Sequence, residues 1–200
     1  MAIKPVLASV FVSMGLLGAA SSAQAAPILQ YASSVIGFSS QYSTTSWSAA
    51  QVLGAPNTMG YGDIATSWAP RSQNGTLEWI SVGFNTAVYA NGATIRETYG
   101  NGFVYQVDAI DTLGNLHTVW QGTDTSLPGA PVNFGVSWNT TSYLVAGLKV
   151  YVNTNHSGAW EEIDSIQLAG MSDRPLPEPA TFAMMLAGLG LVGFTRRRVC

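Results

Sequence analysis

The stretch Trp160–Asp164 holds the densest group of chemically active side chains in the chain, with three carboxylates within four residues. Carboxylate oxygens at the junction of a loop and a strand suit Ca²⁺, which takes six to eight oxygen ligands and tolerates irregular geometry. The alternative is that Glu161 and Glu162 are solvated and that Asp164 caps a turn. No Asp-x-Asp-x-Asp loop is present to strengthen the calcium interpretation.

Aromatic side chains are the second group that could bind a ligand. Exposed tryptophan or tyrosine stacks on the apolar faces of sugar rings, while neighbouring carboxylates or amides bind the hydroxyl groups. Trp47, Tyr61 and Trp68 flank turn-rich loops and are predicted to line a site at the loop end of the fold, with packing against a short helix as the alternative. His156 lies in the loop Asn153–Gly158 and is a further candidate contact. Three tryptophans on expected strands are predicted to be core residues: Trp79, Trp120 and Trp160.

No arrangement typical of catalysis stands out in the sequence. His117 and His156 have no partner at metal-binding spacing, and neither a Gly-x-Ser-x-Gly elbow nor a Gly-rich phosphate loop occurs. The carboxylates that could form a pair for glycoside hydrolysis are Glu97, Glu161, Glu162 and Asp164. Because nothing in the sequence fixes their separation, which decides that chemistry, we predict that the chain is not an enzyme.

The body of the chain, from Ala26 to Leu176, is acidic. It has four basic residues against ten acidic ones, a difference of −6, because the other four basic residues lie at the two ends. Nucleic-acid binding needs a basic footprint, so we exclude a nucleic-acid partner. The single cysteine is Cys200. No disulfide can therefore form within the body, and core packing, with or without a metal, must stabilise it.

The elements that position these residues are predicted to be short strands. Runs of β-branched and aromatic residues are separated by turn-forming pairs such as Asn91-Gly92 and Asn101-Gly102. This spacing is typical of an all-β sandwich or barrel. One short helix is expected at Ser48–Leu53, capped by its serine and stopped by Gly54. The expected strands cover 77–84, 93–98, 103–110, 116–121, 144–153 and 163–168.

The N-terminal segment has the pattern of a signal peptide. Met1–Lys4 is a short positive region, Val6–Ala20 is apolar or small, and Ala23 and Ala25 form a small-x-small cleavage site. We therefore expect residues 1–25 to be removed on export. A retained N-terminal anchor is the alternative.

The C-terminal tail combines the triplet Pro177-Glu178-Pro179, an apolar segment at 180–195 and the arginines Arg196, Arg197 and Arg198. An apolar run followed by arginines stops transfer across a membrane and keeps the last residues in the cytoplasm. The tail closely resembles the PEP-CTERM sorting signal of Gram-negative bacteria. That resemblance implies an exosortase substrate, anchored in the inner membrane with a periplasmic body before processing. The processed protein is then expected at the cell surface or in an exopolysaccharide matrix.

Several motifs of the body also occur in an order that carries a family resemblance. They are Ser39–Ser43, Trp47–Pro56, Tyr61–Asp63, Ile95–Tyr99, Val119–Gly122 and Gly158–Asp164. In this order they resemble a galactose-binding-like jelly-roll module of the kind found in pappalysins, with discoidin-type sugar- and lipid-binding domains as wider relatives. The resemblance implies a β-sandwich that is non-enzymatic by itself and often appended for binding.

The same resemblance points to one metal position. Discoidin-like modules commonly carry a structural Ca²⁺ held by a carboxylate on a late strand and by carbonyls of an early loop. Transferred to this chain, the pattern nominates Glu162, with Asp63 or carbonyls of the segment Trp47–Tyr61 as partners. No other cofactor is expected.

The predicted fold class is all-β: an antiparallel jelly-roll β-sandwich with one short helix. The predicted segments are a signal peptide at 1–25, the sandwich at 26–170, a linker with the Pro-Glu-Pro motif at 171–179, a transmembrane helix at 180–195 and a cytoplasmic basic tail at 196–200. Three functions fit this organisation. The first is a surface or matrix protein that binds carbohydrate or associates with exopolysaccharide. The second is a purely structural matrix protein without a specific ligand, and the third is a surface glycoside hydrolase.

Overall fold

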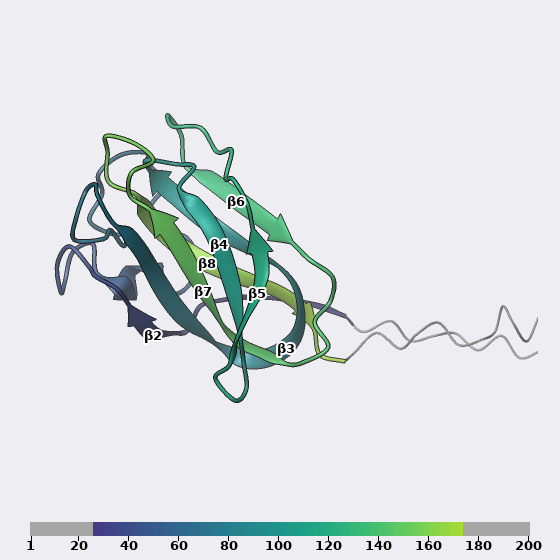
Figure 1. Cartoon of the computed structure of the whole chain (residues 1–200). Helices are drawn as coiled ribbons and strands as arrows, with labels where there is room; N and C mark the ends of the chain where they lie inside the picture. The colour runs from purple at the N-terminus through teal and green to yellow at the C-terminus, as the bar shows by residue number, and fades with distance from the viewer. Residues whose placement is uncertain (1–25, 174–200) are drawn as a thin grey trace, which may run out of the picture. The chain divides into compact units, whose positions relative to one another are not determined.

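The computed structural model describes residues 26–173, which form two antiparallel sheets packed face to face (Figure 1). In chain order the elements are β1 (Pro27–Tyr31), β2 (Ser34–Phe38), the 3₁₀ helix η1 (Ala49–Val52), β3 (Leu77–Tyr99), β4 (Val104–Asp111), β5 (Leu116–Gln121), β6 (Val132–Ser137), β7 (Val145–Asn153) and β8 (Glu162–Met171). The prediction of an antiparallel jelly-roll sandwich is confirmed.

The long strand β3 belongs to both sheets. Its first part, Leu77–Gly83, pairs with β2 and β7, whereas its second part, Tyr89–Tyr99, pairs with β8 and β6. One sheet therefore has the order β2-β3-β7-β4-β5 and the other has the order β1-β8-β3-β6. Figure 1 shows β3 curving from one sheet into the other. This shared strand closes one corner of the sandwich and fixes how the two sheets face each other.

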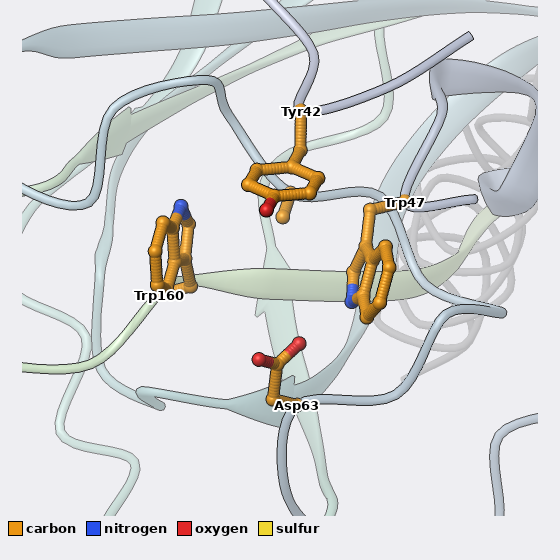
Figure 2. A pocket seen from close by; sticks show the side chains of 5 residues that line it. Tyr42, Trp47, Asp63 and Trp160 are labelled. Carbon is orange, nitrogen blue, oxygen red and sulfur yellow. The ribbon is translucent and has the colours of Figure 1, made fainter. Parts of the chain in front are cut away.

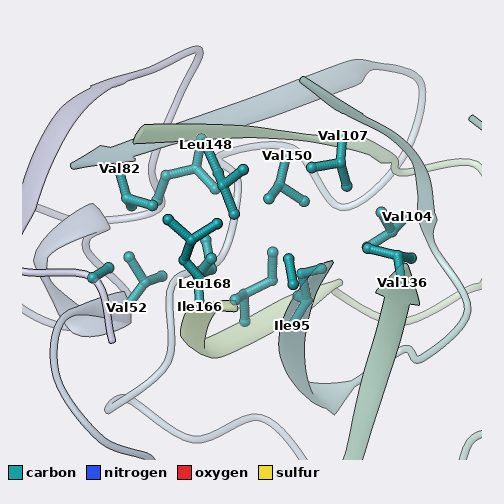
Figure 3. Packing of buried hydrophobic residues seen from close by; sticks show 14 of the residues in the cluster. Val52, Val82, Ile95, Val104, Val107, Val136, Leu148, Val150, Ile166 and Leu168 are labelled. Atoms are coloured by element: carbon teal, nitrogen blue, oxygen red, sulfur yellow. The ribbon is translucent and has the colours of Figure 1, made fainter. Parts of the chain in front are cut away.

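The core lies between the two sheets. Figure 3 shows Val82, Leu148, Val150 and Val107 of one sheet meeting Ile95, Ile166 and Leu168 of the other, and all seven have 0% exposure. Full burial of such a side chain stabilises a fold by about 1.5–3 kcal/mol relative to exposure. Since no cysteine lies between residues 26 and 173, this packing replaces the disulfides that many exported domains use.

The pair Asn91-Gly92 is not a turn, so the strands expected at 77–84 and 93–98 are parts of one strand. Gly92 lies inside β3, where the pairing with β8 shifts register between Ala90 and Gly92. A Cβ atom on Gly92 would lie 2.9 Å from the carbonyl oxygen of Val136. The glycine therefore permits close approach of β6 at an irregular point of the strand. The strands β1, β2 and β6 were not among those predicted from the sequence.

The helix expected at Ser48–Leu53 is a single 3₁₀ turn, Ala49–Val52. Ser48 does not cap it, because its hydroxyl donates to the carbonyl oxygen of Thr45 at 3.2 Å. Val52 is fully buried, so the turn contributes to the core. The expected stop is in place: Gly54 follows with a φ of 85°, a left-handed conformation that favours glycine.

The signal peptide with Ala23 and Ala25, the Pro-Glu-Pro motif, the segment 180–195 and the tail 196–200 lie outside the described residues. Within residues 26–173, no helix has the length and apolar character needed to span a membrane.

Candidate functional site

The candidate site is a pocket of about 40 Å³ at one end of the sandwich, lined by Tyr42, Trp47, Asp63, Ala69 and Trp160. Four of these residues belong to the long connection between β2 and β3, and Trp160 lies just before β8. The pocket is therefore built from loops that the two sheets hold together, which is where function on such folds concentrates.

Three aromatic rings form the walls of the pocket. The ring centroids of Tyr42 and Trp47 are 5.4 Å apart with planes at 73°, and those of Tyr42 and Trp160 are 5.7 Å apart at 84°. Figure 2 shows the two indoles on opposite sides, with Tyr42 across one end and the Asp63 carboxylate at the other. Tyr42 is 53% exposed. The arrangement gives a slot with aromatic walls and an acidic end.

Trp47 holds its place in the wall with an unusual backbone. Its φ of 50° makes it the one non-glycine residue with positive φ among the described residues, and a bulky residue is rarely found there. The Trp47 N–H donates to the Ala65 carbonyl at 3.0 Å, and the Ala69 N–H donates to the Trp47 carbonyl at 3.3 Å. Such conformations persist where the surroundings enforce them, and they gather at binding sites. Here the conformation places an indole at the pocket.

A buried carboxyl group holds this wall through the indole N–H of Trp47. Glu162, at the start of β8, has 0% exposure. It accepts hydrogen bonds from Trp47 Nε1 at 3.2 Å and from the Ile64 N–H at 3.3 Å. Burial raises the pKa of Glu162 to about 8; the bond from Ile64 opposes this shift and the nearby Asp63 adds to it. Glu162 therefore fixes the orientation of the Trp47 indole.

The other two carboxylates of the stretch are also buried. Asp164 accepts the backbone N–H groups of Asn57 and Thr58 at 3.1–3.3 Å, so it anchors the long connection between β2 and β3 to the start of β8. Glu161 has 0% exposure, and burial raises its pKa to about 8. The alternative of a solvated Glu161 and Glu162 is therefore wrong.

The structure separates the residues predicted for the site. Trp47 and Asp63 line the pocket. Tyr61 instead packs edge-on against Tyr99, with centroids 5.5 Å apart. Trp68 is fully buried and its Nε1 donates to the Ser40 carbonyl at 3.1 Å. His156 is exposed in another loop, with Nε2 2.7 Å from the carbonyl oxygen of Asn101.

Three pocket residues were not predicted: Tyr42, Ala69 and Trp160. Tyr42 carried only the signal of its motif, Ser39–Ser43, and Trp160 was expected in the core because it precedes a strand. Of the three tryptophans expected in the core, Trp120 is partly buried and packs against it, whereas Trp79 and Trp160 are partly exposed outside it. The fully buried tryptophan is Trp68, which was expected in the site.

Calcium at Glu162 and Asp63 stays a prediction. The two carboxyl groups do lie together. However, both Glu162 oxygens accept N–H groups, and residues 26–173 contain no group of three or more His, Cys, Asp or Glu side chains suited to a metal. Two carboxyl groups beside aromatic walls match the six to eight oxygens of a calcium site poorly.

The two sheets and their connections define the fold class of the body: an antiparallel β-sandwich of the galactose-binding-like type. The chain belongs to the family described as Pappalysin-1, SD scarf domain, C-terminal, whose model matches residues 20–179. A second model, the PEP-CTERM protein-sorting motif, matches residues 175–199. Both family resemblances seen in the sequence are thus confirmed. Among curated proteins, no sequence matches the chain.

Solved structures share the fold at low sequence identity. The family 32 carbohydrate-binding module of NanJ from C. perfringens, in complex with galactose, has a TM-score of 0.52 and 16% identity, over 71% of this chain and 99% of that chain. Reduced XRCC1 bound to the DNA pol beta catalytic domain has a TM-score of 0.50 and 15% identity, over 70% and 97%. Allantoicase from Saccharomyces cerevisiae has a TM-score of 0.49 and 16% identity, over 68% and 39%. Since the NanJ module and XRCC1 share this fold but are different kinds of protein, function has to be argued from the site.

Proposed function

We propose that the chain is an exported, non-enzymatic protein of the cell surface or exopolysaccharide matrix whose sandwich binds carbohydrate. The observation that carries this proposal is the aromatic pocket in the loops of a carbohydrate-binding-module type of fold. The exposed Tyr42 ring offers a stacking face, and Asp63 offers hydrogen-bond acceptors beside it. Aromatic faces with adjacent carboxylates suit sugar rings and their hydroxyl groups.

The pocket supports binding better than hydrolysis. Glycoside hydrolysis ordinarily uses two carboxyl groups that flank the scissile bond. Asp63 is the single carboxylate in the lining. Glu162 is not among the lining residues and is held by two N–H donors.

The sorting motif supports the proposed route to the surface. In this proposal the signal peptide is removed at Ala25, the arginines Arg196–Arg198 stay cytoplasmic, and an exosortase-type membrane protease cuts near Pro177-Glu178-Pro179. The proline pair keeps that segment extended and accessible. Mass spectrometry of surface protein from the native host tests this step. Intact peptides that run through Phe194 in the extracellular pool would contradict it.

A glycan array with the purified full chain tests the binding function, with Trp47→Ala as the pocket variant and Leu113→Ala as the control. Leu113 is 85% exposed and lies in the turn between β4 and β5, outside the pocket. We expect glycans that bind the wild type and the control to lose about tenfold or more in affinity with Trp47→Ala. If no glycan binds the wild type, the chain is better explained as a structural matrix protein without a specific ligand.

A further inference from the structure

A lysine elsewhere in the sandwich packs its ammonium group against aromatic rings, so the chain itself contains an example of an ammonium bound in this way. The Lys149 ammonium lies 4.0 Å from the ring centroid of Trp79 and 4.8 Å from that of Tyr151. The Tyr151 hydroxyl donates to Asp108 at 2.7 Å, so a carboxylate completes the group. An ammonium is attracted to the negative faces of aromatic rings within about 6 Å of their centroids.

The pocket repeats this composition without a cation of its own. Its lining has two indoles, one phenol and the Asp63 carboxylate, and it contains no lysine or arginine. Within residues 26–173, both cation–aromatic contacts belong to Lys149. Because the centroids of Trp47 and Trp160 each lie within 6 Å of the Tyr42 centroid, a cation at the centre of the slot would lie within cation–π range of all three rings.

The size of the pocket favours a small group over a whole sugar ring. One water occupies roughly 10–15 Å³ on this measure, so about 40 Å³ holds a group of only a few atoms. This volume is too small for a pyranose ring with its hydroxyl groups, whereas an ammonium substituent could enter the slot while the rest of its carrier stays outside. The exposed Tyr42 would then meet that carrier.

The charge of the pocket and its surroundings also favours a cation. Figure 2 shows the Asp63 carboxylate at the end of the slot opposite Tyr42, and the body carries six more acidic than basic residues. Indole walls suit Ca²⁺ poorly, because this ion is coordinated by six to eight oxygen ligands. An organic cation gains from both the rings and the carboxylate.

We propose that the slot between Trp47, Trp160 and Tyr42 binds an alkylammonium group, with Asp63 as its counter-ion. The group could be the free amine of an amino sugar or a trimethylammonium head group. The proposal rests on the proposed function because it uses the same pocket. It specifies the charged substituent that a bound glycan would place there.

The test is titration calorimetry on the full chain in a polyoxyethylene detergent, which supplies neither sugar nor choline. Choline is compared with its neutral isostere 3,3-dimethyl-1-butanol, and glucosamine with glucose and N-acetylglucosamine. We expect at least one cationic ligand to bind about tenfold or more tightly than its neutral counterpart. Equal affinity for the cationic and neutral members of both sets would overturn the proposal.

Variants locate the site. Asp63→Asn keeps the shape of an exposed side chain and should cost the cationic ligand about tenfold in affinity, a larger loss than for any neutral ligand, because only the cation loses its counter-ion. Trp160→Phe and Trp47→Phe should each weaken the cation with little effect on folding, which the melting temperature checks. The matched control is Tyr61→Phe, an aromatic residue of the same loop outside the pocket. Unchanged affinity in all three pocket variants would place the cation elsewhere and overturn the proposal.

The outcomes also separate this inference from the carbohydrate function. If neutral glycans bind in a Trp47-dependent way and cations gain nothing, the glycan function stands and the ammonium proposal fails. If choline binds and no sugar does, the ammonium proposal stands, its source is a trimethylammonium group, and the glycan function loses its support.

Discussion

The cluster around Lys149 and the pocket around Trp47 use the same kinds of side chain but are built in different ways. Trp79 and Tyr151 are opposite each other in the register of β3 and β7, and Lys149 is two residues from Tyr151 on the same face. The regular pairing of β3 with β7, together with the two-residue period of a strand, brings these residues together. The pocket draws its rings from residues 42, 47 and 160, which only the tertiary structure makes neighbours.

This difference assigns different roles to the two groups. The sheet cluster has its cation supplied by the chain, so its contacts contribute to stability. The pocket has an open end and a backbone held in a strained conformation at Trp47, so its contacts are available to a ligand. Variants should therefore divide into those that change stability and those that change binding.

Trp68→Ala should have the largest effect and should lower stability and binding together. Trp68 supports the pocket without being one of its lining residues. Its backbone exchanges hydrogen bonds with Ile163 at 2.8 and 3.0 Å, and its side chain is fully buried. Loss of a core tryptophan costs about 3–5 kcal/mol. Urea unfolding should show this loss, and binding should fall with it. A stable Trp68→Ala protein with normal affinity would show that the loop is held in another way.

Calcium removal has the next largest expected effect, if the ion is bound. A ligand at 100 times its Kd stabilises a protein by about 2.7 kcal/mol. A chelator should then lower the melting temperature, and Glu162→Gln should abolish the response. An identical melting curve with and without chelator would exclude calcium and leave the ammonium proposal unaffected.

Buried carboxyl groups should make stability depend on pH. Burial, and then the neighbouring Asp124, raises the pKa of Glu97 to about 10, and burial raises the pKa values of Glu161 and Glu162 to about 8. Between pH 5 and 8 the folded state thus holds protons that the unfolded state has lost. Stability should therefore fall as pH rises, by up to about 1.4 kcal/mol per pH unit for each proton.

Glu97→Gln tests this pH dependence with a matched side chain. It should reduce the slope of unfolding free energy against pH by up to about 1.4 kcal/mol per pH unit, the value for one proton. Urea unfolding at several pH values between 5 and 8 measures this slope. Glu78→Gln is the matched control, because Glu78 is a second buried glutamate of β3. Its carboxylate accepts hydrogen bonds from the hydroxyl groups of Ser39 and Ser40. A slope unchanged in Glu97→Gln would show that Glu97 is ionised in the folded protein.

Lys149→Met should have the smallest effect and sharpens the contrast between the two groups. Methionine keeps an unbranched side chain over Trp79 and removes the charge. The expected loss is about 0.5–1 kcal/mol of stability, measured by thermal unfolding, with ligand binding at the pocket unchanged. A change in binding would show that the two groups are coupled.

The places where the structure differs from the predicted elements have a common physical cause. The pair Asn91-Gly92 predicts a turn by its conformational preferences, yet β6 and β8 pair across it and hold it in a strand. The alternation in Leu77–Phe84 predicts the strand but not which face is buried by a second sheet. Trp79 consequently lies under Lys149 rather than in the core.

The sequence by itself determined the sandwich, the sorting motif and the loops that hold Trp47 and Asp63, because strand periodicity, turn residues and end signals are local properties. Only the tertiary structure decided that Trp68 is buried, that Trp47 and Trp160 lie on opposite sides of a slot, and that Glu162 fixes the Trp47 indole. These facts depend on where loops far apart in the chain are brought together by the shared strand β3. Local preferences contain no information about such distances, which packing between the two sheets sets.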